Sequence, residues 1–163
     1  MKKQRVKDFI NPEMCDISED LVFTEPYNDY KHRNIVTAGN EGFIRENLYE
    51  NEPLQVEVAL LRHNFMNNAQ SLLHGDLHTG SIFINQTGLK VIDPEFAFYG
   101  PAGYDIGNVL AHLYFPMIEN LFDSTSDQEF HQWCKETIAA VYDQVQAKLA
   151  IVYDEAVTFP MYR

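Results

Sequence analysis

Apolar residues recur at helical spacing in several parts of the chain. Within residues 55–73 they are three or four positions apart and comprise Val58, Leu61, Phe65, Ala69 and Leu72. This period predicts an amphipathic helix. A second helix is expected from about Tyr104, after the turn residues of "GPAG". Its apolar residues lie on several faces, which predicts that it is buried.

A third helix is predicted toward the C-terminal end. Ser126 is followed three residues later by Glu129. That is the spacing of a capping box, in which each side chain accepts a free backbone N–H at the helix start. Helical spacing then continues to about residue 150 through Phe130, Trp133, Ile138, Val141, Val145 and Leu149.

Between the first two predicted helices the pattern changes to that of strands. The runs "SIFIN" and "LKVID" are short and largely apolar, and "QTG" between them is a turn signal, so they predict a small β-hairpin. The first 55 residues are rich in turn formers and are expected to be irregular. One short helix is expected there, in "ENLYENEPLQ", ending before Pro53.

These patterns predict one domain over residues 1–163 that is mainly α with a small β-hairpin, an α+β class. The length of 163 residues is enough to bury a core. The formal net charge of -12 repels phosphate backbones and argues against nucleic-acid binding. Cys15 and Cys134 form no CxxC pair, so no disulfide framework or zinc ribbon is predicted.

The sequence contains no apolar run close to the roughly 20 residues that a membrane span needs. Its basic N-terminus lacks the apolar segment of a signal peptide. We therefore expect a cytoplasmic protein without membrane contacts.

Polar residues gather at the two outer ends of the predicted hairpin. Asp76 lies in a loop flanked by Gly75 and Gly80, and a carboxylate on a rigid loop can accept a proton from a hydroxyl group. Asp93 and Glu95 end the second strand and could point into the same cleft, where they would suit Mg²⁺. A base and a Mg²⁺ site are the minimum equipment for phosphoryl transfer.

Two segments, "HGDLHTGSIFIN" and "VIDPEFAFYGPAGYDIGNV", resemble the catalytic and metal-binding segments of protein-kinase-like small-molecule kinases, the aminoglycoside phosphotransferase and choline kinase group. More narrowly, the chain resembles the methylthioribose kinases. Ser81 stands where the wider group usually has Asn, and Asp93 is followed by Pro94 and Glu95. The resemblance covers roughly residues 20–160 and implies the C-terminal lobe of a protein-kinase-like fold.

The resemblance also implies a role for each polar residue. Asp76 would be the catalytic base, taking the proton from the 1-hydroxyl of methylthioribose, with ATP as co-substrate. Asp93 and Glu95 would hold Mg²⁺ between the ATP phosphates. The product would be 5-methylthioribose 1-phosphate, an intermediate of methionine salvage, and the full-length enzyme would be a homodimer. Residues that support the catalytic loop would be His74, His78, Ser81 and Asp105, the last by binding loop backbone N–H groups.

A kinase of this group also needs an N-terminal lobe, with a loop over the phosphates and a lysine that grips them. The sequence has no Gly-rich loop after an early strand and no lysine in a recognisable strand. We therefore expect a partial, C-terminal kinase-like lobe without the nucleotide-clamping lobe. Such a chain should turn over weakly or not at all by itself.

Several alternatives remain open. Asp76 could cap its loop, Asp105 could cap the following helix, and the two carboxylates after the hairpin could be a solvated strand end. His74, Asp76 and His78 alternate and could bind zinc in a metal hydrolase, but no further histidine cluster supplies the remaining ligands. Another small-molecule kinase of aminoglycoside or choline type, or a non-catalytic kinase-like fragment, is also consistent with the sequence.

Overall fold

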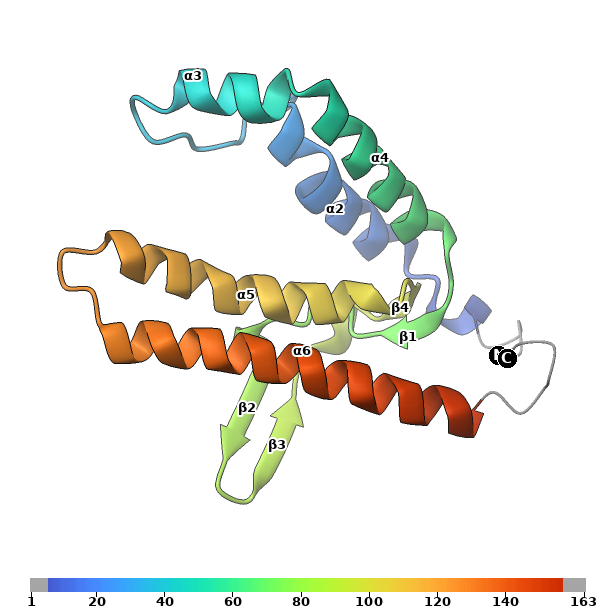
Figure 1. Cartoon of the computed structure of the whole chain (residues 1–163). Helices are drawn as coiled ribbons and strands as arrows, with labels where there is room; N and C mark the ends of the chain where they lie inside the picture. The colour runs from blue at the N-terminus through green and yellow to red at the C-terminus, as the bar shows by residue number, and fades with distance from the viewer. Residues whose placement is uncertain (1–5, 157–163) are drawn as a thin grey trace. The chain divides into compact units, whose positions relative to one another are not determined.

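The computed structural model describes residues 6–156, and the chain divides into two compact units between Ile106 and Gly107. The described residues are mainly helical and carry two small antiparallel sheets (Figure 1). The mainly α class with small β elements is therefore confirmed, although the sequence predicted one hairpin and the structure has a second two-stranded sheet.

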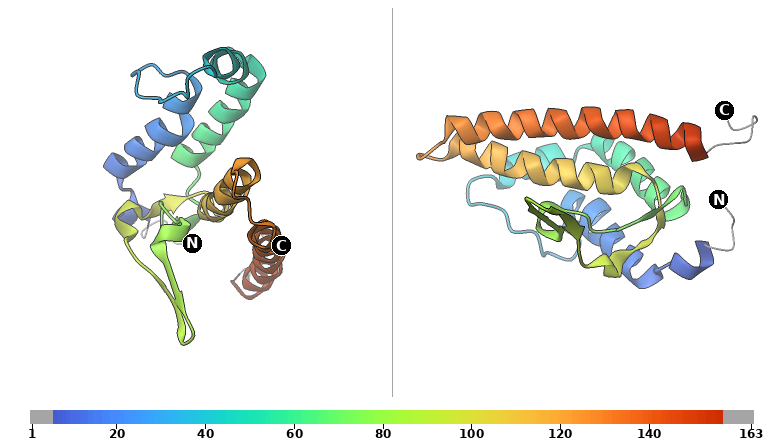
Figure 2. Two further views of the ribbon diagram at one scale, coloured as in Figure 1. Left: turned by 90° about the vertical axis from the view of Figure 1, so that its left-hand side faces the viewer. Right: turned by 90° about the horizontal axis from the view of Figure 1, so that it is seen from below.

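Two helices dominate the first unit. α2 (Pro12–Phe23) and α4 (Glu52–Asn67) pack side by side in opposite directions (Figures 1 and 2). Short turns surround them: η1 (Lys7–Phe9), η2 (Glu25–Tyr27), α3 (Glu41–Ile44) and the π-helical η3 (Arg45–Tyr49). The expectation of an irregular stretch over the first 55 residues was therefore wrong.

Helix α2 escaped prediction because it has little apolar periodicity. Its buried residues are only Cys15 and Ser18. The backbone nonetheless marks its start. Pro12 occupies the first turn, where a missing N–H costs nothing, and the Cys15 N–H donates to the carbonyl of Asn11 at 3.0 Å. A helix start was thus present in the sequence without the periodic signal that reveals a helix.

Helix α4 begins at Glu52, with a proline in its first turn. The side chain of Asn51 accepts a hydrogen bond from the Leu54 N–H at 3.1 Å, and Pro53 lies in the first turn. Proline is favoured at such a position because its fixed φ suits the helix. The short helix expected before Pro53 is present as η3, which ends at Tyr49, and Pro53 belongs to the first turn of the next helix, α4.

The helix predicted over residues 55–73 ends early, at Asn67, and its last predicted turn is a strand. β1 (Ser71–Leu73) pairs antiparallel with β4 (Phe98–Gly100). Leu73 is buried in this pairing. A short apolar run such as "SLL" fits a helix or a strand equally well by period, so the sequence alone did not separate them.

The predicted hairpin is confirmed. β2 (Ile82–Asn85) and β3 (Gly88–Val91) pair antiparallel, with Ile82 opposite Val91. The side chain of Asn85 accepts hydrogen bonds from the Thr87 and Gly88 N–H groups at 2.8 and 3.1 Å and so shapes the turn.

An aromatic cluster forms the core of the first unit. Phe65 of α4 is 2% exposed. Its ring centroid lies 5.1 Å from that of Phe23 in α2, 4.9 Å from Phe98 in β4 and 4.8 Å from Tyr104. Buried Cys15 and Leu73 complete the cluster. Phe65 therefore joins both helices to the sheet that precedes the polar loops.

The second unit is a helical hairpin. α5 (Gly103–Phe122) begins in the first unit and continues into the second, where it lies alongside the antiparallel α6 (Gln128–Ala156) (Figure 2). The helix predicted from about Tyr104 is confirmed. The capping prediction was wrong. Asp127, not Ser126, accepts the N–H groups of Glu129 and Phe130, at 2.9 and 3.1 Å.

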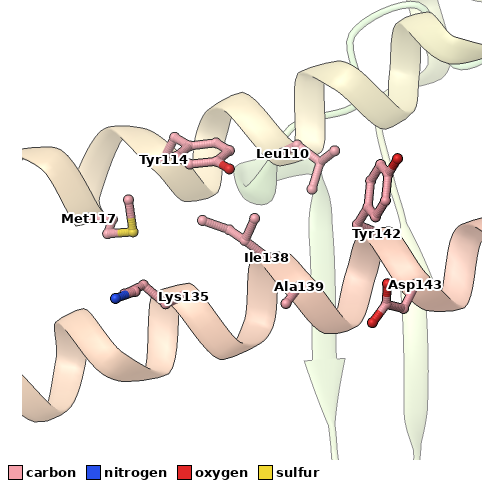
Figure 3. A pocket seen from close by; sticks show the side chains of 8 residues that line it. All are labelled: Leu110, Tyr114, Met117, Lys135, Ile138, Ala139, Tyr142 and Asp143. Atoms are coloured by element: carbon pink, nitrogen blue, oxygen red, sulfur yellow. The ribbon is translucent and has the colours of Figure 1, made fainter.

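Most of α5 is not buried, contrary to prediction. Its one buried residue is Leu113, whereas Phe115 and Phe122 are exposed. α5 and α6 line a largely apolar hollow of about 430 Å³ (Figure 3). Its lining residues are Leu110, Tyr114, Met117, Lys135, Ile138, Ala139, Tyr142 and Asp143. No residue expected in the active site lies in it.

Within residues 6–156 no helix is long and apolar enough to cross a membrane. Cys15 and Cys134 are both free and buried.

We expect Phe65→Ala to lower the free energy of unfolding by about 3–5 kcal/mol, because it removes the ring that joins α2, α4 and β4. Urea denaturation followed by far-UV circular dichroism measures this change. Phe83→Ala is the control, since the Phe83 ring is 59% exposed. Equal losses in the two variants would contradict this description of the core.

Candidate active site

Most residues expected in the active site lie in two loops. One loop follows β1 and the other follows β3. β1 ends at Leu73 and leads into the loop of Asp76, while β3 ends at Val91 and leads into Asp93. Both loops belong to the first unit, as does Asp105 in the first turn of α5. The two loops are connected by backbone contacts and by one side chain.

Asp105 fixes the start of the first loop. Its Oδ2 accepts the His74 N–H at 2.7 Å, and its Oδ1 accepts the Gly75 N–H at 3.0 Å. Hydrogen bonds to a carboxylate are stronger than those between neutral groups. These contacts are of the kind that the resemblance implied for Asp105, whose role as a support of the loop stays a prediction.

Gly75 allows the two loops to touch. Its φ is +88°, in the left-handed region. A Cβ at this position would lie 2.1 Å from the carbonyl oxygen of Phe96 and 2.7 Å from its carbonyl carbon. Real atoms cannot approach so closely, so only glycine fits here. The loop of Asp76 therefore packs backbone against backbone on the turn that follows Asp93.

His74 links the same two loops through its side chain. Its Nε2 lies 2.8 Å from the carbonyl oxygen of Ile92, which can only accept, so Nε2 carries the proton. Its Nδ1 is then free to accept the Asp76 N–H, at 3.4 Å. The hydrogen-bond partners thus favour the tautomer with the proton on Nε2. His74 connects the backbone at Asp76 with the residue before Asp93.

Ser81 holds the far end of the first loop. It is 4% exposed, and its Oγ donates to the carbonyl of Asp76 at 3.2 Å. Its carbonyl accepts the Ile92 N–H at 3.1 Å, which again connects the two loops. Ser81 thus supports the loop by packing and hydrogen bonds.

Asp76 itself remains open to solvent, with its side chain 49% exposed. The Nδ1 of His78 accepts the Gly80 N–H at 3.1 Å, so Nε2 carries the ring proton when the ring is neutral. That nitrogen lies 3.7 Å from Oδ2 of Asp76. The arrangement leaves one face of the carboxylate accessible to a hydroxyl group and places a donor on another.

Asp93 and Glu95 lie at a tight turn after β3. Asp93 has φ +66° and precedes the helical turn η5 (Pro94–Phe96). Both residues are exposed, and neither carboxylate forms a hydrogen bond or ion pair with another residue of the described part of the chain. Their oxygens are thus available to a cation. Two carboxylates with room for water and phosphate oxygens fit the ligand preference of Mg²⁺.

Asn11 contacts this turn, and sequence reasoning missed it. Its Nδ2 donates to the carbonyl oxygens of Glu95 at 2.8 Å and Ala97 at 3.2 Å. The residue lies 84 positions before Glu95. The Asn-Pro pair indicates a helix start but carries no signal of so distant a contact.

Tyr104 lies beneath the site and responds to its charges. Burial raises the pKa of the Tyr104 hydroxyl to about 12, and the negative charges of Asp76 and Asp105 act in the same direction. A phenolate here would lose hydration and face two carboxylates. Tyr104 is therefore held in its neutral form.

The zinc alternative gains no support from the geometry. Among residues 6–156 no group of three or more His, Cys, Asp or Glu side chains could hold a metal ion. Both ring nitrogens of His74 are already used in hydrogen bonds to the backbone. His74 therefore serves as a link between loops and has no nitrogen left for zinc.

Comparison with known proteins places this site in a family context. Residues 30–147, more than half of the chain, match the Phosphotransferase enzyme family. Methylthioribose kinase of Exiguobacterium sibiricum is 48% identical over 114 residues, 70% of this chain and 29% of that protein. Those of Geobacillus kaustophilus and Erwinia tasmaniensis are 49% and 52% identical, each over 69% of this chain and 28% of the relative. The chain thus spans less than a third of these relatives.

We expect Gly75→Ala to lower the free energy of unfolding by at least about 2 kcal/mol, because the new methyl group clashes with backbone and φ is unfavourable. Gly42→Ala is a matched control, since it lies in α3 with open space around its Cβ position. Urea denaturation of both variants measures the difference. Similar stability of the two variants would show that the loops separate without cost.

The raised pKa of Tyr104 predicts a loss of stability at alkaline pH. Below pH 10 the hydroxyl is protonated in both states, and between about pH 10 and 12 only the unfolded state releases its proton. Stability should therefore fall across this range as pH rises, and fall less steeply in Tyr104→Phe. Thermal unfolding at several pH values measures this, with Tyr142→Phe as control. An unchanged slope in Tyr104→Phe would be evidence against a buried neutral phenol.

Proposed function

Because the chain belongs to the Phosphotransferase enzyme family, we propose that it is part of an ATP-dependent kinase that phosphorylates the 1-hydroxyl of methylthioribose. One observation carries the chemical part of this proposal. The backbone of the Asp76 loop packs on the turn of Asp93 and Glu95, with Gly75 at the contact and His74 linking both loops. A base and two metal ligands are therefore held on one framework.

Asp76 is the proposed base. When the substrate hydroxyl oxygen forms its bond to the γ-phosphorus of ATP, the hydroxyl proton passes to the Asp76 carboxylate. The bond between the γ-phosphorus and the bridging oxygen of ADP breaks in the same displacement. The half-exposed carboxylate supports this role because a hydroxyl group can reach it, and the nearby Nε2 of His78 helps to orient it.

Asp93 and Glu95 would hold Mg²⁺. The ion would supply the positive charge that offsets the charge of the ATP phosphates. The left-handed backbone of Asp93 and the turn η5 set the directions in which the two side chains leave the chain. Asp105 and Ser81 contribute indirectly, by holding the backbone on either side of Asp76.

The substrate is proposed from the printed names of the relatives, which are methylthioribose kinases. The structural part of the proposal is that these residues fold as part of the C-terminal lobe of a protein-kinase-like fold. Since the chain spans 28–29% of these relatives, we expect weak or no turnover by the 163 residues alone. A homodimer of the full-length enzyme, a place in methionine salvage and a cytoplasmic location stay predictions.

A hybrid enzyme tests the reaction. The 115 matched residues of the Geobacillus kaustophilus relative are exchanged for those of this chain, and ATP-dependent phosphorylation of methylthioribose is measured. We expect turnover, and a loss of about 10²- to 10⁴-fold in Asp76→Asn, because a general base contributes roughly that factor.

Glu119→Gln is the control for this experiment, since it neutralises an exposed carboxylate of α5 outside the polar cluster. It should leave turnover within about twofold of the parent hybrid, as expected for a surface change. If Asp76→Asn lost no more than Glu119→Gln, Asp76 would not be the base.

The metal ligands are tested in the same hybrid. Asp93→Asn should abolish Mg²⁺-dependent ATP binding, because it removes one of two charged oxygen ligands. Isothermal titration calorimetry with ATP, in the presence of Mg²⁺ or of a chelator, measures this. Binding that persists unchanged in Asp93→Asn would place the metal ion on other residues.

A further inference from the structure

The side chain of Asn11 does something unusual for a residue at a helix start. Asn11 opens α2 and would ordinarily cap the helix with its side-chain oxygen, yet it makes no such bond. Instead its Nδ2 donates to two backbone carbonyls far along the chain, those of Glu95 and Ala97. The Asn11 carbonyl accepts the first hydrogen bond of the helix, from the Cys15 N–H at 3.0 Å, and Pro12 has no N–H that needs a partner. The amide therefore serves the distant turn.

The two accepting carbonyls lie on either side of Phe96, whose own carbonyl is packed against Gly75. The turn that follows Asp93 is thus held from two directions. The catalytic loop fixes its middle, and Asn11 fixes its flanks. No other described side chain donates a hydrogen bond to the carbonyls of Glu95 and Ala97.

Left-handed backbone occurs at Asn11 and at Asp93, which lies two residues before Glu95. Asn11 has φ +44° and Asp93 has φ +66°, two of the four non-glycine residues with positive φ in the described chain. Such residues persist only where their surroundings hold them, and they concentrate at functional sites. Asn and Asp tolerate this conformation better than other side chains.

We propose that Asn11 is a positioning residue for the metal-binding turn. Its amide fixes the backbone on which Glu95 lies, and through Phe96 and the turn it limits the arrangements open to Asp93. The inference rests on the proposed function for the identity of the ligand. Asn11 lies before residue 30, where the family match begins, so its role extends the site beyond the matched region.

Asn11→Gly is the cleanest test, because glycine keeps the positive φ without strain and removes only the amide. The chain contains a closely matched control. The Nδ2 of Asn34 also makes two hydrogen bonds, to the Glu25 carbonyl at 2.8 Å and to the Tyr49 hydroxyl at 3.2 Å. Asn34→Gly deletes the same kind of group at the same distances, away from the metal-binding turn.

The first measurement is the affinity for Mn²⁺, used as a paramagnetic substitute for Mg²⁺. The 163-residue chain is titrated, and broadening of the backbone amide signals of Asp93 and Glu95 is followed by NMR. Asn11→Gly removes both hydrogen bonds of the amide and should weaken binding at least about fivefold, the factor expected for a single typical hydrogen bond. Asn34→Gly should bind as the parent chain does. In Asp93→Asn, Mn²⁺ should not broaden the amide signals at these positions.

The second measurement is amide hydrogen exchange without metal. The Ala97 N–H donates to the Pro94 carbonyl within the turn and should exchange several times faster in Asn11→Gly than in Asn34→Gly. Unchanged exchange at Ala97 would overturn the positioning role of Asn11, as would unchanged Mn²⁺ affinity in Asn11→Gly.

The two proposals can fail separately. If the parent chain shows no broadening that depends on Asp93, the proposed metal site is wrong, and Asn11 cannot position it. If broadening depends on Asp93 but Asn11→Gly and Asn34→Gly bind equally well, the metal site stands and only the role of Asn11 is wrong.

Discussion

The candidate site depends on a glycine, Gly75, at the point where its two loops touch. At Gly75 the absence of a Cβ lets the carbonyl of Phe96 approach the loop backbone to a distance that no other residue would permit. Because of this approach, the loop of Asp76 and the turn after Asp93 share one surface of contact. The hydrogen bonds of Asp105 to His74 and Gly75 hold the loop in the conformation that makes the approach possible.

The remaining contacts convert this approach into a rigid arrangement. His74 and Ser81 each connect the Asp76 loop with Ile92, the residue before Asp93. Asp76 can therefore stay half exposed while its backbone is fixed. Catalytic groups gain most when they are oriented before the substrate arrives, since no energy is then spent on ordering them during the reaction.

The sequence located the polar loops better than it predicted the helices and strands around them. The "HGDLH" and "DPE" motifs placed the polar residues at two loops, and the hairpin between them was recognised because its strands have a clear period and a clear turn. The second sheet was not recognised, because "SLL" and "FYG" are too short to separate strand from helix.

Other misses have equally local causes. A helix does end before Pro53, as predicted, but the start of α4 at this proline was not predicted, although proline is favoured in a first turn. The contact of Asn11 with Glu95 joins residues 84 positions apart, and no local pattern encodes it. A contact between two residues so far apart in the sequence could be found only in the structure.

The length of that connection has a consequence for the way the site assembles. Asn11 is made early and its partners at residues 95 and 97 late, so a nascent chain must close a loop of more than 80 residues before the turn is held. Closing long loops is entropically costly, and structures rich in such contacts fold slowly. The hairpin of β2 and β3, with its adjacent strands, can form first. The polar site should therefore be among the last parts of the first unit to become ordered.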